Sequence, residues 1–141
     1  MMTTSWTQPA RELASEARGW GGVWTLTYAI GLALQRLAAM EGRDEDLTLT
    51  YAGLDVALAT SELAWADPSE PAQAGPVDLG PLAPLERQEA ICVVLQLLGS
   101  NIELLSTLVT DPATSGGRVL SGTRALGLLI GAERSLRASW S

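Results

Sequence analysis

Two carboxylates, Glu103 and Asp55, have the sequence settings in this chain that best suit acid–base chemistry. Glu103 is the one charged residue between Ala90 and Thr110, and Asp55 flanks the apolar stripe of another long stretch. A carboxyl group in apolar surroundings has a raised pKa and can act as a general acid or base. The chain has no histidine and no lysine, which excludes Ser-His-Asp and Cys-His catalysis, histidine metal sites and Schiff-base chemistry. We therefore expect no metal or cofactor, and any catalysis would depend on such a carboxylate.

Aromatic residues form a second group whose spacing suits a site. Trp20, Trp24 and Tyr28 lie one helical turn apart at the start of one predicted helix, and Trp65 lies near the end of the next. Antiparallel packing of these helices would bring the four rings to one end of a bundle. The group is compatible with core filling, with a flat apolar ligand pocket, or with a docking spot for a partner peptide. With Glu103 added, it is the candidate ligand-binding site.

Two helical strips that carry few charges predict an interface. One runs from Cys92 to Thr110 at three- and four-residue steps, and the other contains the pattern Gly-Leu-Leu-Ile-Gly, which lets another backbone approach closely. A solvated helix face usually carries several charges, so we expect a neighbouring helix or a second copy of the chain to cover these strips. The alternatives for the first strip are an exposed face that binds nothing and a groove that binds a ligand. We also expect Glu103 to pair with Arg124 or Arg134. The candidate interface residues are Gln96, Gly99, Glu103, Arg124, Gly127 and Gly131.

Composition favours self-association over binding to nucleic acid or membranes. Apolar residues make up 47% of the 141 residues and charged residues 18%, whereas about a quarter is typical of soluble domains. A homodimer would cover the excess apolar surface. The net charge of −7, with nine arginines as the only cationic side chains, disfavours contact with phosphate backbones and anionic lipid surfaces. The single cysteine, Cys92, is expected to be a buried thiol, and it is compatible with a reducing, cytoplasmic setting.

The elements that must position these residues are predicted to be helices. Ala90–Thr110 contains no proline and is apolar on most sides, which indicates a helix with several neighbours. The glycine-rich segment 19–22 predicts a break. The predicted helices are 11–18, 23–40, 47–66, 85–110 and 117–139. The apolar stripe of the third of these is Leu47, Tyr51, Leu54, Leu58 and Trp65, with Val56 and Leu63 beside it.

Together these features predict an all-α protein of one domain, residues 1–141. It is a four-helix bundle with a short additional N-terminal helix. Residues 1–6 are expected to be a flexible tail, and residues 67–84 a long Pro-rich connection between the second and third long helices, with Val77, Leu79 and Leu82 held against the core. We expect no membrane span, because Arg36 and Glu103 interrupt the two longest apolar stretches.

The expected function is that of a non-catalytic binding or assembly module that forms a homodimer. A protein partner or an apolar small molecule are the other occupants considered. The alternative is a small ligand-binding or isomerase-like enzyme that uses Glu103 or Asp55 beside the Trp-lined pocket.

Overall fold

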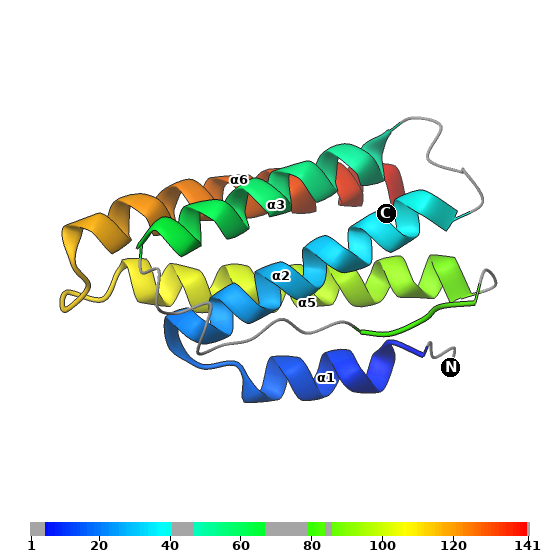
Figure 1. Ribbon diagram of the computed structural model, residues 1–141, viewed down its shortest axis with the longest axis horizontal. Helices are drawn as coiled ribbons and strands as arrows, with labels where there is room; N and C mark the ends of the chain where they lie inside the picture. The colour runs from blue at the N-terminus through cyan, green and yellow to red at the C-terminus, as the bar shows by residue number, and fades with distance from the viewer. Residues whose placement is uncertain (1–4, 41–46, 67–78, 84–85, 141) are drawn as a thin grey trace.

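The computed structural model describes residues 5–40, 47–66, 79–83 and 86–140, and in these ranges it contains five α-helices. They are α1 (Thr7–Glu16), α2 (Gly19–Ala39), α3 (Thr48–Ala66), α5 (Arg87–Val109) and α6 (Gly116–Trp140). Figure 1 shows α3 and α6 side by side in one layer, α2 and α5 in a second layer, and α1 against that second layer on the far side. The predicted all-α class is confirmed, and the contacts among the four long helices fit the predicted bundle.

The core lies between the two layers, and α2 and α5 supply most of it. Leu98 and Leu105 of α5 and Ile30 of α2 are fully buried. One polar contact is buried with them: the Asn101 Nδ2 donates a hydrogen bond to the Thr27 Oγ1 at 2.8 Å. The Thr27 hydroxyl in turn donates to the carbonyl of Val23, four residues earlier, at 2.7 Å. Because a buried amide needs a partner, this contact fixes how α5 lies along α2.

α5 is also the one helix in the described ranges that is long and apolar enough to cross a membrane. The central helix of a soluble bundle has the same length and composition, and α5 contacts α1, α2 and α6. Its apolar character is therefore weak evidence for a membrane span.

The N-terminal segment differs from the predicted flexible tail. Residues 1–4 lie outside the described ranges, but Trp6 is fully buried and its indole Nε1 donates to the Gly80 carbonyl at 2.9 Å. The Ser5 backbone N–H and hydroxyl both donate to the Glu86 carboxylate, at 2.7 Å and 3.1 Å to Oε1. A buried tryptophan and a carboxylate at the start of α5 thus hold the beginning of α1 in place.

The glycine-rich segment after α1 is helical, so the predicted break was misplaced. α1 ends at Glu16, and α2 already begins at Gly19, which has a φ of +60°. The chain turns at Ala17 and Arg18 instead. A Cβ on Gly22 would lie 2.9 Å from the Ala17 carbonyl carbon, so the turn between the helices is tight enough to require glycine at that position.

The Pro-rich connection is described only at residues 79–83, which form no regular element. There Leu79 is buried and Leu82 is half-buried, and both pack against the core as predicted. Val77, the third residue expected to contact the core, lies outside the described residues.

Candidate functional site

The largest departure from expectation is the outer face of α3. The side chains of Leu47, Tyr51, Leu54 and Leu58 are 45%, 59%, 55% and 56% exposed, and we call these four residues the outer stripe. Val56 and Leu63, which were expected only beside the stripe, are the buried residues that face the core. The side chain of Trp65 lies outside the described residues. The four described residues of the predicted stripe therefore point to solvent, and the small residues Ala52, Gly53 and Ala59 supply much of the inward face.

Charges are missing from this face. The exposed residues of α3 in the range 48–64 are Thr50, Tyr51, Leu54, Ala57, Leu58 and Ser61. None of them is ionisable at neutral pH. The two charged residues of that range, Asp55 and Glu62, are half-buried and lie to one side of the stripe. Contiguous apolar surface of this kind on a monomer usually marks an interaction site.

The outer side of α6 carries small and basic residues at the same spacing. Leu120, Arg124, Gly127, Gly131 and Arg134, here the glycine strip, recur at steps of four and three residues and point away from the buried side of the helix. A Cβ built on Gly127 or Gly131 would meet no atom within 4 Å. The fold of one chain therefore does not require glycine at either position.

The polar strip of α5 is open to solvent and lacks its predicted ion pair. Gln96 and Glu103 are exposed, and Gly99 is half-buried, where an added Cβ would lie 3.8 Å from the Glu133 Oε2 of α6. Glu103 forms no ion pair with Arg124 or Arg134 in the described part of the chain. Both arginines belong to the glycine strip on the outer side of α6, so they point away from α5. Cys92, expected to be buried, is exposed.

Trp20, Trp24 and Tyr28 are not among the described residues that line either of the two cavities described below. Trp24 is buried and its ring stacks on Tyr28 with centroids 5.2 Å apart. Trp20 packs against Gly122 of α6, and the Arg118 guanidinium lies 5.5 Å from its ring centroid. These contacts fit core filling, which was one of the alternatives for the group.

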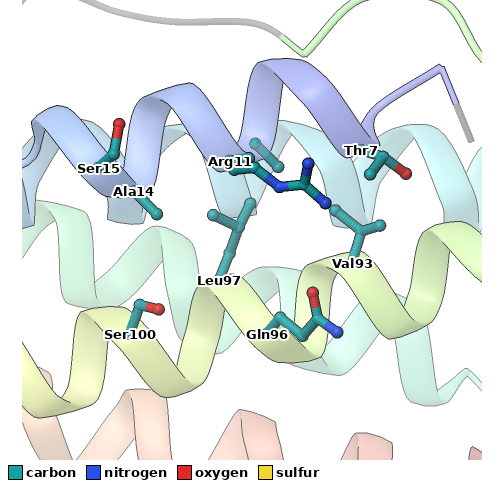
Figure 2. Close-up of a pocket in the computed structure, with 9 residues that line it drawn as sticks. Thr7, Arg11, Ala14, Ser15, Val93, Gln96, Leu97 and Ser100 are labelled. Carbon is teal, nitrogen blue, oxygen red and sulfur yellow. The ribbon is translucent and has the colours of Figure 1, made fainter. Parts of the chain in front are cut away.

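A cavity of about 400 Å³ lies between α1 and α5, and sequence reasoning did not predict it. α1 contributes Thr7, Ala10, Arg11, Ala14 and Ser15, and α5 contributes Val93, Gln96, Leu97 and Ser100. Figure 2 shows the Arg11 guanidinium and the Gln96 amide on the Val93 side of Leu97, with Ala14 and Ser100 on the other side. Gln96 and Ser100 belong to the predicted polar strip, but nothing in the sequence indicated that α1 would pack above them.

A second groove, of about 340 Å³, lies between the end of α2 and the start of α3. Its lining includes Ala38 and Ala39 of α2 with Leu54 and Ala57 of α3, and none of the described residues that line it is charged. Leu54 belongs to both the groove and the outer stripe, so the two form one continuous apolar surface.

The arrangement offers little for acid–base or metal chemistry. Glu103 is exposed and Asp55 is half-buried, and neither lines the α1–α5 cavity or the α2–α3 groove. In the ranges that the structure describes, no three His, Cys, Asp or Glu side chains come together in a way that could hold a metal ion. The α1–α5 cavity and the α2–α3 groove offer apolar surface and hydrogen-bonding groups.

Comparisons with protein-family models, with curated proteins and with solved structures found no match. Function must therefore be inferred from these surfaces and cavities.

Proposed function

We propose that this chain is a non-catalytic helical module that forms a homodimer through the outer face of its α3–α6 layer. The observation that carries the proposal is the outer stripe of α3, four large apolar side chains in a face without charges. The α5 strip does not carry it, because in a single chain that strip is exposed and includes Glu103.

The spacing of the outer stripe suits a second helix. Its residues follow one another at steps of four, three and four, which is the repeat of a coiled-coil seam. A two-fold dimer needs one self-complementary surface, and a layer of two antiparallel helices can supply both halves of it. We propose that the outer stripe of each copy packs on α6 of the other.

The glycine strip supports this pairing by shape and by charge. Gly127 and Gly131 leave a shallow furrow into which large side chains from a second copy could fit, as small residues do at close helix contacts. Arg124 and Arg134 flank the glycines, whereas Asp55 and Glu62 flank the outer stripe. Packing α3 on α6 of the second copy brings these opposite charges near each other, and packing α3 on α3 would bring the acids together.

The available apolar area corresponds to a reversible dimer. Complete burial of a leucine-sized side chain is worth about 1.5–3 kcal/mol, so covering a half-exposed one yields about 1 kcal/mol. The four residues of the outer stripe then contribute about 8 kcal/mol over two copies. Association costs at least about 4 kcal/mol in lost freedom, which leaves about 4 kcal/mol from the outer stripe, or a Kd of roughly 1 mM. Contacts from the glycine strip tighten the dimer, so we expect a Kd between about 10 µM and about 1 mM.

Sedimentation equilibrium tests the proposal. Over roughly 5 µM to 2 mM, a range that brackets the expected Kd, the mass should rise from 14.8 kDa towards twice that value. Leu58→Glu places a carboxylate in the proposed interface and should weaken the dimer at least tenfold, because the charge must either be buried or hold the two copies apart. Thr107→Glu, a matched charge on the exposed face of α5, should leave the mass curve unchanged.

Two results would count against this assignment. A 14.8 kDa mass throughout the concentration range would overturn self-association. A dimer that Thr107→Glu disrupts and Leu58→Glu does not would move the interface to α5. Gly127→Ala gives a further check, since added methyl groups should weaken the dimer even though they suit the helix of a single chain.

The proposed module has no nucleic-acid or membrane partner and works in the cytoplasm. Its net charge of −7 and its single cysteine support this placement.

A further inference from the structure

The cavity between α1 and α5 lies on the opposite side of the bundle from the α3–α6 layer, and it is built differently (Figure 1). Its floor is apolar: Ala10, Val93 and Leu97 are each buried to at least nine-tenths of their surface. Its rim is polar, with hydroxyl groups from both helices and the amide of Gln96. A volume of about 400 Å³ falls within the usual range of small-molecule sites, about 300–1,000 Å³.

Arg11 is the single charged residue among the described residues that line this cavity. It is exposed, and it forms no hydrogen bond or ion pair in the described part of the chain. Other arginines are engaged: Arg18 donates to the carbonyls of Ser15 and Ala17, and Arg137 pairs with Glu133 at 3.4 Å. No carboxylate of the described ranges lines the cavity, although the chain as a whole has a net charge of −7. The cavity therefore presents an unpaired cation to an anionic ligand.

The shape of the cavity is elongated along the helices. On α1 its lining runs from Thr7 to Ser15, eight residues apart, which at about 1.5 Å per residue gives a length of about 12 Å. Figure 2 places the Arg11 guanidinium and the Gln96 amide towards one end and Ala14 towards the other, with Leu97 between them. A ligand that fits would have a polar head at the Arg11 end and a narrow apolar body.

We propose that this cavity binds a medium-chain monocarboxylate. The guanidinium of Arg11 matches the two oxygens of a carboxylate, with the Gln96 amide as a further donor. The acyl chain lies on Ala10, Ala14 and Leu97, where the alanines leave room for it. A phosphate dianion fits less well, because a single arginine would have to balance its charge. The site is separate from the proposed dimer interface and does not depend on it.

Octanoate is the probe we would use, in calorimetric titration at pH 7, with 1-octanol and inorganic phosphate as comparisons. We expect octanoate to bind more tightly than 1-octanol and phosphate to give no signal. Arg11→Gln should weaken octanoate binding roughly 10- to 100-fold, the effect of a lost charge-assisted hydrogen bond, and leave 1-octanol unaffected. Arg18→Gln, in the turn between α1 and α2 and outside the cavity lining, is the matched control and should change the binding of neither ligand.

Amide NMR spectra locate the binding site. Octanoate should shift the signals of Ala14, Gln96 and Leu97, and Ser100→Leu, which fills the cavity from its exposed rim, should abolish those shifts. The monomeric Leu58→Glu variant should bind octanoate as the parent chain does. The proposal is overturned if octanoate does not bind, if Arg11→Gln binds it equally well, or if the shifted signals lie on α3 instead.

Discussion

Substitution by alanine should change the free energy of unfolding in opposite directions at two glycines of α6 that lie five residues apart. A Cβ on Gly122 would lie 2.6 Å from the Val109 Cγ1 and 2.9 Å from the Trp20 Cη2, whereas a Cβ on Gly127 would meet nothing within 4 Å. Both positions are helical, so alanine gains the same propensity at each, about 1 kcal/mol. The surroundings alone distinguish Gly122→Ala from Gly127→Ala.

The loss of stability expected for Gly122→Ala depends on the side chains that the new methyl group would displace. Val109 is β-branched and has few alternative rotamers, and the Trp20 ring also contacts the Arg118 guanidinium, 5.5 Å from its centroid. Forcing a methyl group into such a site costs typically 1–3 kcal/mol, which exceeds the helix-propensity gain. We expect Gly122→Ala to lower the free energy of unfolding by about 1 kcal/mol, and Gly127→Ala to raise it by about 0.5–1 kcal/mol.

Urea denaturation followed by circular dichroism at 222 nm measures both changes. The protein concentration should stay below the dimer Kd, so that the unfolding of single chains is compared. Equal shifts for the two variants, in either direction, would refute the packing of Trp20 against α6.

Two other predictions concern contacts that position the helices. Thr27→Val removes the acceptor of the buried Asn101 amide and should lower the free energy of unfolding by about 1–3 kcal/mol, measured by chemical denaturation. The double variant Thr27→Val/Asn101→Leu should recover most of that stability, because no buried amide is then left without a partner. Stability losses that simply add in the double variant would contradict this reasoning. Hydrogen bonds from the backbone N–H groups of Ala83 and Ser5 lower the pKa of Glu86 in the folded chain. The stabilisation is therefore complete above the unfolded-state pKa of about 4.3 and is lost as the pH falls below it, so the NMR signal of the Trp6 indole N–H should change between pH 6 and pH 3. Glu86→Gln should show the changed signal already at pH 6.

The helical class and the number of long helices could be predicted because they depend on local patterns. Apolar residues at three- and four-residue steps identified α2, α3, α5 and α6. Segment 19–22 was misread because helix propensity counts glycine as a cost. It takes no account of the close approach of Gly22 to Ala17, which only the packed structure reveals.

The orientation of α3 could not be predicted from the same pattern. The outer stripe has the larger side chains, and hydrophobicity alone assigns larger side chains to the core. In the bundle, α3 instead turns Ala52, Val56 and Ala59 inward, since α2 and α5 already fill the interior with leucine and isoleucine. The missing charges around Tyr51, Leu54 and Leu58 were a signal that both sides of α3 are apolar, and exposed apolar surface of this kind usually marks an interaction site.

The position of α1 explains part of the apolar surface of α5. α1 has 10 residues and α5 has 23, so at 1.5 Å per residue α1 is about 15 Å long and α5 about 34 Å. The two run in the same direction, and α1 lies over α5 from Val93 to Ser100. That part of α5 carries no charge, and the next charged residue along the helix, Glu103, follows where α1 has ended. α1 thus covers Val93 and Leu97 in the uncharged stretch of α5, whereas Gln96 and Ser100 stay exposed beside it. The face of α3 has no such cover in the described residues, which is why the proposed dimer is placed there.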